Sequence, residues 1–236
     1  ITNFRERLAL LASTGIDRVL VLKFNAELRD MSAEDFVSRV FVDGLGARYS
    51  ALGDDSRFGS SREGDYDYVR RLAAQFDYEV QPTGTLEIGD ARVSSTRIRS
   101  ALAEGHFSEV QALLGRPFTM TGRVEHGRKL GRELGAPTAN IRINRIRSPL
   151  SGVFAVRVDG PELESAAAVA NVGTRPTVDD GLKANLEVHL LDRQCDLYGQ
   201  RLEVRFLHKL REEIKYESLD ALKEGMAKDI DNAGHW

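Results

Sequence analysis

A two-residue alternation of apolar and polar side chains runs through the second half of the chain and constrains its fold more than any other feature. It recurs in three segments, residues 154–158, 186–190 and 202–206. In the first of them, Phe154, Val156 and Val158 share one face of an extended strand, because successive side chains point to opposite sides. Several short strands separated by glycine and proline turns predict a small antiparallel β-barrel. A C-terminal helix beginning at Ser218 is expected to pack across this barrel.

The first hundred residues follow a different pattern, in which helical and extended segments alternate. Helices are predicted near residues 3–13, 32–40 and 66–76, and extended apolar runs near residues 19–22, 49–52 and 78–80. This alternation predicts an α/β domain with βαβ units around a parallel sheet. A short helix over residues 107–114 ends at Gly115, where the pattern changes. We therefore expect two domains, residues 1–114 and 115–236.

Composition argues against several classes of protein. The formal net charge of −3 provides no overall positive field, so no nucleic-acid partner is expected. No apolar run approaches the roughly 18 residues of a membrane span, so no membrane partner is expected either. Cys195 is the only cysteine, which makes a reduced, cytoplasmic setting the simplest interpretation. The sequence leaves the oligomeric state open.

A glycine-rich basic segment, which includes Gly127, Lys129 and Gly131, lies between two predicted strands. Glycine lets the backbone approach a phosphate closely, and nearby cations offset the phosphate charge. The segment does not match the P-loop pattern GxxxxGK[ST], and the chain carries no HRD or DFG kinase motif. By itself, such a hairpin is more often a solvated loop than a nucleotide site.

Three polar residues on the strands that follow are candidates for chemistry. Thr138 and Asn140 lie two apart, so both face one side of a strand and offer the hard oxygen ligands that Mg²⁺ accepts. Their alternative role is to hold a turn after Pro137. Glu187 points away from the core that its neighbours face, and its carboxylate can accept the proton of an alcohol. Without further context, a strand glutamate is usually a solvent-facing residue.

Several separated blocks of the second half resemble bacterial riboflavin kinases in order and spacing. They are GRVEHGRKLGRELGAPTANI (122–141), SGVFAV (151–156), AVANVGTRPTV (168–178), LEVHLLD (186–192), DLYGQ (196–200) and KLREE (209–213). The resemblance covers essentially all of residues 115–231. It implies a small β-barrel kinase that transfers the γ-phosphoryl group of ATP to the 5′-hydroxyl of riboflavin and so makes FMN.

The same resemblance implies roles for the candidate residues. In these kinases the PTAN segment contacts Mg²⁺ and phosphate, which implies that Thr138 and Asn140 hold Mg²⁺ and the phosphates of ATP. Glu187 would be the catalytic base that deprotonates riboflavin. Nucleotide contacts are implied for the glycine-rich loop, at Gly127, Lys129 and Gly131, and a flavin contact is implied for Arg211.

The first half resembles the Rossmann-like flavin adenylyltransferase domain of bifunctional FAD synthetases. The blocks GDDSRFG (53–59), REGD (62–65) and VSSTRIR (93–99) carry this resemblance. The last block begins a helix whose amides can face an anion, although an ordinary capped helix is an equal alternative. The implied adenylyltransferase site residues are Ser94, Ser95, Thr96 and Arg99.

One motif of those adenylyltransferases is missing from this sequence. None of the five histidines lies in an HxGH motif, so we expect only part of the adenylyltransferase domain here. This chain is then expected to make FMN, and FAD synthesis is expected only of a longer parent protein. The alternative is a non-catalytic flavin-binding or flavin-sensing protein, against which the intact set of Thr138, Asn140 and Glu187 argues.

Overall fold

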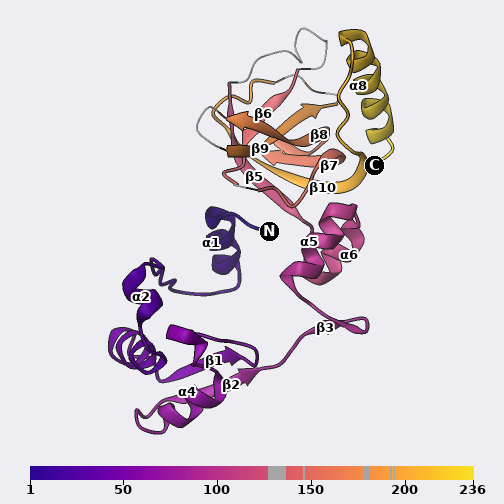
Figure 1. Cartoon of the computed structure of the whole chain (residues 1–236). Helices are drawn as coiled ribbons and strands as arrows, with labels where there is room; N and C mark the ends of the chain where they lie inside the picture. Colours follow the sequence, from indigo (N-terminus) through magenta and orange to yellow (C-terminus); the bar gives the residue numbers. More distant parts are fainter. Residues whose placement is uncertain (127–136, 146, 178–180, 192, 194) are drawn as a thin grey trace. The chain divides into compact units, whose positions relative to one another are not determined.

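The computed structural model describes residues 1–126, 137–145, 147–177, 181–191, 193 and 195–236 (Figure 1). The chain forms two compact units. One contains residues 1–17 together with residues 94–236, and the other contains residues 18–93. Within the described residues, no helix is both long enough and apolar enough to cross a membrane.

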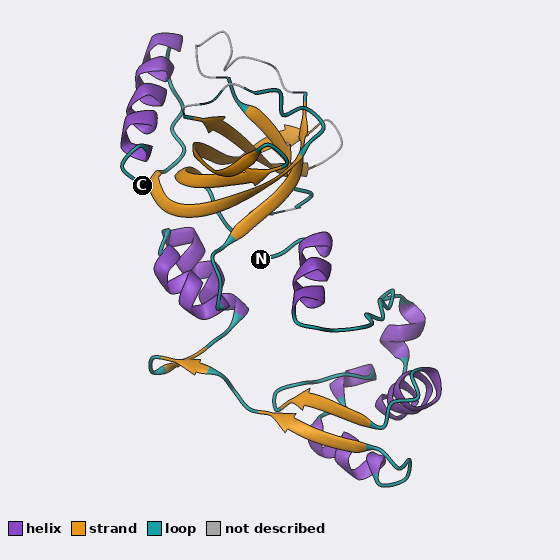
Figure 2. Ribbon diagram, turned by 180° about the vertical axis from the view of Figure 1, so that it is seen from behind, coloured by secondary structure: helices purple, strands orange, loops and turns teal. Residues whose placement is uncertain are grey.

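The larger unit contains a closed six-stranded antiparallel barrel, as the period-two pattern predicts (Figure 2). Its strands are β5 (Thr119–Glu125), β6 (Ala139–Arg142), β7 (Gly152–Gly160), β8 (Leu163–Thr177), β9 (Gly181–Leu190) and β10 (Arg201–Arg211). They follow one another around the barrel in the order β10, β5, β6, β9, β8 and β7. The barrel closes because the first and last strands of this order also pair with each other.

Alternate residues of each strand fill the barrel. Phe154, Leu186 and Leu202 are completely buried, and the ring of Phe206 packs edge-on against Phe154 at 5.3 Å between centroids. Phe107, the first residue of helix α6 (Phe107–Leu114), stacks on Phe206 at 6.1 Å. The helix predicted over residues 107–114 is therefore confirmed, and it packs against the barrel.

The C-terminal helix α8 (Leu219–Ala233) covers part of the outer face of the barrel (Figures 1 and 2). Ser218 caps it by accepting a hydrogen bond of 3.1 Å from the amide of Ala221. Ala233 and Ile230 of the helix pack against a cluster that includes Val153 and Val169. As a result, β7 is buried on both faces, which explains its nearly continuous run of apolar residues.

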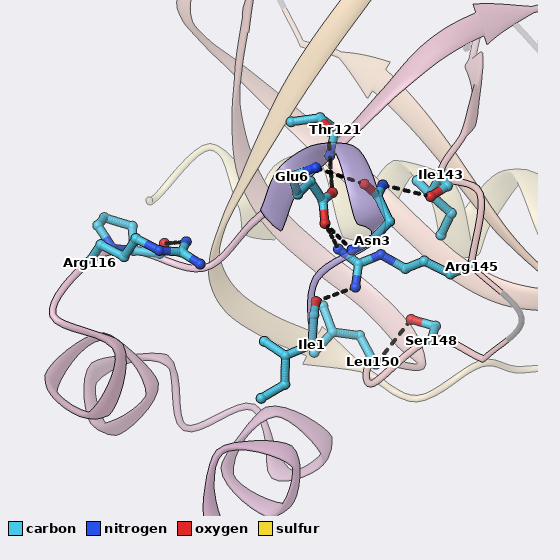
Figure 3. Close-up of polar contacts among 10 residues, drawn as sticks. Ile1, Asn3, Glu6, Arg116, Thr121, Ile143, Arg145, Ser148 and Leu150 are labelled. Atoms are coloured by element: carbon cyan, nitrogen blue, oxygen red, sulfur yellow. Dashed lines mark hydrogen bonds and ion pairs between the residues drawn. The ribbon is translucent and has the colours of Figure 1, made fainter. Parts of the chain in front are cut away.

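The first helix, α1 (Phe4–Ser13), belongs to the same unit as the barrel. Asn3 caps it, and the buried carboxylate of Glu6 completes a capping box by accepting a hydrogen bond of 2.8 Å from the amide of Asn3. Glu6 also accepts from the amide of Thr121 on β5 at 2.8 Å and pairs with Arg145 at 2.5 Å (Figure 3). The N-terminal helix is thus bonded to the barrel across more than a hundred residues of sequence.

The smaller unit is built around a parallel pair of strands, β1 (Tyr49–Gly53) and β2 (Glu79–Thr83), as the helix–strand alternation predicts. Helix α4 (Tyr66–Ala73) connects them, and its Val69 and Leu72 pack into a core with Val37 and Tyr78. The remaining elements are α2 (Ala26–Asp30), α3 (Ala33–Asp35), the π-helix η1 (Phe36–Gly44), the short helix η2 (Ser60–Arg62), β3 (Glu87–Ile88) and β4 (Ala91–Arg92).

The apolar run at residues 19–22 is predicted to be extended, but the structure does not form a strand there. Its four side chains are between 42% and 58% exposed, and this segment joins no ladder among the described strands. An apolar run forms a strand only where a neighbouring backbone is placed to pair with it, and sequence pattern alone does not supply that neighbour.

The proposed boundary at residues 114 and 115 stays a prediction. Helix α5 (Ser95–Glu104) and helix α6 lie in the same compact unit as the barrel, together with α1.

Candidate active site

Three strands bring a row of polar side chains together on the outer face of the barrel. Glu187 on β9 is directly opposite Asn140 on β6 and directly opposite Asn171 on β8. Residues that oppose each other in neighbouring strands share a face of the sheet, so these three side chains are neighbours. The sequence predicted Asn140 and Glu187 as site residues, and the register of β9 is what places Asn171 beside them.

The carboxylate of Glu187 faces away from the barrel interior, as the alternation predicts. Its neighbours Leu186 and Val188 are 0% and 1% exposed, whereas Glu187 itself is partly exposed. Asn185, two residues earlier on the same strand, donates a hydrogen bond of 2.8 Å from Nδ2 to Oε1 of Glu187. The local geometry therefore presents a carboxylate that a neighbouring amide orients.

The two asparagines flanking Glu187 each carry an oxygen that has no partner among the described residues. Among the described residues, neither Oδ1 of Asn140 nor Oδ1 of Asn171 accepts a hydrogen bond, although both atoms are buried. Burying such an oxygen unsatisfied costs about 1–3 kcal/mol. Both atoms are therefore suited to accept from a ligand, and that of Asn140 is suited to ligate a cation.

A cavity of about 260 Å³ lies between this face of the barrel and α8. Its walls combine the polar side chains of Thr138, Asn171 and Glu187 with apolar ones such as Leu222 and Met226. An apolar cavity with a few convergent polar groups is typical of a site for an organic ligand.

Arg211, the last residue of β10, lines this cavity and is held in place by α8. Its guanidinium makes two hydrogen bonds to the buried carboxylate of Asp229, at 2.8 and 2.6 Å. These hydrogen bonds raise the pKa of Arg211 above its usual value. The guanidinium also lies over the ring of Tyr216, at 5.7 Å from its centroid. Asp229, which the sequence analysis did not single out, thus fixes the planar face of Arg211.

A second, larger cavity of about 630 Å³ adjoins the start of β6. Pro137, Thr138 and Ala139 line it, together with Asp196 and Tyr198 from the segment before β10. Thr138 lines both cavities. A group bound at Thr138 therefore has access to the larger cavity on one side and to Glu187 on the other.

The remaining predicted residues are not brought into these cavities by the described structure. Gly127, Lys129 and Gly131 lie outside the described residues. Ser94 caps α5, as predicted, by accepting a hydrogen bond of 3.2 Å from the amide of Arg97. The linings of the two cavities do not include Ser94, Ser95, Thr96 or Arg99.

The described residues contain no cluster of three or more histidine, cysteine, aspartate or glutamate side chains that would hold a metal ion by themselves. Without such a cluster, a divalent cation at β6 could be held by neutral oxygens together with oxygens of a bound phosphate. Thr138 and Asn140 fit that requirement, because a hydroxyl and an unpaired amide oxygen are acceptable to a hard cation that keeps water and phosphate ligands.

Comparison of the chain with known proteins shows which family it belongs to. The family description "Riboflavin kinase" matches residues 114–236, and "FAD synthetase" matches residues 1–97. A bifunctional riboflavin kinase/FMN adenylyltransferase of Pseudomonas fluorescens is 50% identical over 92% of this chain and 69% of its own length. The chain belongs to this family. The Escherichia coli K12 member is 42% identical over 97% of this chain and 73% of its own length.

The family assignment confirms both resemblances identified from the sequence. The fold agrees with a solved structure as well: a chain from Streptococcus pneumoniae, titled as a macrolide-efflux protein, is 30% identical, with a TM-score of 0.81. The match covers 100% of this chain and 75% of that one. The shared fold therefore covers the residues of both compact units.

Proposed function

We propose that this chain is a riboflavin kinase, which transfers the γ-phosphoryl group of ATP to the 5′-hydroxyl of riboflavin. The observation that carries the proposal is the position of Thr138, which lines both cavities, beside the row formed by Asn140 and Glu187. ATP occupies the larger cavity in this proposal, and riboflavin occupies the smaller one under α8. Phosphoryl transfer then takes place at Thr138, where the two substrates meet.

For phosphoryl transfer, the protein mainly has to position the two substrates and stabilise the charge of the transition state. Thr138 and Asn140 would hold Mg²⁺, which when bound would neutralise charge on the phosphates. Glu187 orients the ribityl hydroxyl and accepts its proton as the oxygen–phosphorus bond forms and the bond to the ADP leaving group breaks. Arg211, fixed by Asp229, provides a planar wall for the flavin ring, and Gly127, Lys129 and Gly131 contact the nucleotide in this proposal.

The FAD synthetase match to residues 1–97 supports a second proposed activity, FMN adenylylation, for the parent protein. Ser94, Ser95, Thr96 and Arg99 at the start of α5 are its proposed phosphate contacts, because free amides at a helix N-terminus favour an anion. Cys195 is an unpaired, exposed cysteine, which supports a reduced and cytoplasmic location. No observation favours the non-catalytic flavin-binding alternative.

The test is a direct assay with purified protein, riboflavin and ATP. In the presence of Mg²⁺, we expect FMN and ADP to form in equal amounts, measured by chromatography of the flavins and by coupled detection of ADP. Excess chelator should abolish turnover, because the described residues contain no cluster of three or more histidine, cysteine, aspartate or glutamate side chains that would retain the cation against a chelator. Full turnover in metal-free buffer would contradict the proposed role of Thr138 and Asn140. Flavin binding without any ADP release would favour the non-catalytic alternative.

A further inference from the structure

Asn185 contacts the group that the proposed kinase uses as its proton acceptor. Asn185 and Glu187 lie two residues apart on β9, so both side chains emerge on the outer face of the barrel. The hydrogen bond from Nδ2 to Oε1 is 2.8 Å long, and both side chains are partly buried. A hydrogen bond from an amide to an ionised carboxylate is charge-assisted and so stronger than one between neutral groups.

This bond restricts the rotation of the Glu187 carboxyl group. The last torsion of a glutamate is broad, so an unrestrained carboxyl group samples many orientations. Engaging Oε1 fixes the plane of the carboxyl group and therefore the direction in which Oε2 points. A proton acceptor works only when its oxygen lies within hydrogen-bond reach of the hydroxyl. Orientation of the carboxylate by Asn185 therefore bears directly on the reaction.

A second carboxylate lies close to the same amide. Gly173 on β8 is directly opposite Asn185, and a Cβ at Gly173 would lie 2.1 Å from Oε1 of Glu213. The Glu213 carboxylate thus occupies the space that a side chain at position 173 would need. Glu187, Glu213 and the cation of Arg211 line the same cavity. A neutral amide at position 185 donates to Glu187 without adding a further negative charge there.

We propose that Asn185 is a positioning residue for phosphoryl transfer, which holds the Glu187 carboxylate in the orientation that accepts the riboflavin proton. The inference rests on the proposed kinase function and on Glu187 as its proton acceptor. Asn185 acts through Glu187, so its effect should appear in kcat and depend on the carboxylate.

Two substitutions separate hydrogen bonding from packing. Asn185→Ala removes the donor, and we expect kcat to fall about 5- to 20-fold while the riboflavin KM changes less than about 2-fold. Asn185→Asp keeps the shape of the side chain but replaces the donor with a carboxylate beside that of Glu187, so it should lose more activity than Asn185→Ala. If residue 185 only filled space, the isosteric Asn185→Asp would retain wild-type kcat, and the inference would be wrong.

Repeating Asn185→Ala in a Glu187→Gln background tests whether the effect passes through the carboxylate. Once the proton acceptor is gone, removing its orienting donor should change kcat less than about 2-fold. An equal fold-loss in both backgrounds would assign Asn185 a purely structural role and overturn the inference. Asn232→Ala on the exposed face of α8 is the matched control, and it should leave kcat and the melting temperature unchanged.

The same experiment distinguishes failure of this inference from failure of the proposed function. A wild-type protein that releases no ADP would contradict the kinase assignment itself. A Glu187→Gln variant with nearly wild-type kcat would remove Glu187 from the mechanism and the proposed role of Asn185 with it. An active enzyme that needs Glu187 but tolerates Asn185→Asp would contradict the positioning role alone.

Discussion

The candidate site depends on which side chains share one face of three strands. The alternation along β9 turns Glu187 away from the barrel interior, and the register with β6 and β8 places Asn140 and Asn171 on either side of it. Each of these three residues is ordinary by itself. Their chemistry arises because the strands that carry them are adjacent in the barrel.

The first prediction at this scale concerns the proton acceptor. Glu187→Gln keeps the size of the side chain and its hydrogen bonding but removes the carboxylate, so kcat should fall about 10²- to 10⁴-fold. Riboflavin affinity should change little, because the cavity keeps its shape. Steady-state rates and a flavin fluorescence titration measure the two quantities separately.

The matched control is Glu203→Gln on β10, a strand glutamate outside the linings of both cavities. It should leave kcat within about 2-fold of wild type. If Glu187→Gln weakened flavin binding and preserved kcat, Glu187 would position the ribityl chain without accepting its proton.

At the scale of elements, the buried carboxylate of Glu6 connects helix α1 to the barrel by hydrogen bonds and an ion pair. Glu6 is 7% exposed and Arg145 is 9% exposed, and Glu6 also accepts from the amides of Asn3 and Thr121 (Figure 3). Arg145 makes a further hydrogen bond to the carbonyl of Ile1. Glu6 therefore accepts hydrogen bonds from Asn3 before α1, from Thr121 on β5 and from Arg145.

We expect Glu6→Ala to destabilise the unit that contains the barrel by about 3–5 kcal/mol, because it leaves Arg145 buried without a counter-ion. Chemical denaturation followed by circular dichroism measures the change in the free energy of unfolding. Glu224→Ala, on the exposed surface of α8, is the control and should change that free energy by no more than about 0.5 kcal/mol. Equal stability of the two variants would show that α1 is not integral to this unit.

At the scale of the whole molecule, the two family matches and the two compact units divide the chain differently. The FAD synthetase match covers residues 1–97, yet residues 1–17 lie in the compact unit that contains the barrel. Helix α5, which carries the proposed adenylyltransferase contacts at its start, also belongs to that unit. Segments assigned to the two activities by sequence therefore share one structural unit.

The corresponding prediction concerns the products of this chain. Purified protein of these 236 residues should convert riboflavin to FMN and should not convert FMN and ATP to FAD, because none of its histidines lies in an HxGH motif. Chromatography of the flavins after incubation with MgATP measures both reactions in one sample. Accumulation of FAD would show that other residues of this chain carry out adenylyl transfer.

The sequence by itself determined the barrel, the parallel strand pair and the starts of several helices, because periodicity and capping residues act locally. The alternation around Glu187 and the caps at Ser94 and Ser218 are examples. Resemblance to riboflavin kinases added the proposed roles of Thr138 and Asn140. The sequence did not indicate that the run at residues 19–22 would pair with none of the described strands.

Only the tertiary structure decided which distant residues meet. Asn171 opposes Glu187 through the register of β8, Asp229 reaches Arg211 from α8, and Glu6 pairs with Arg145 across 139 residues. A hydrogen bond between distant residues leaves no periodic signal in the chain, since nothing in the spacing of two residues says that their strands or helices will pack together. These contacts follow from barrel closure and from the docking of α1 and α8, which depend on the whole apolar core.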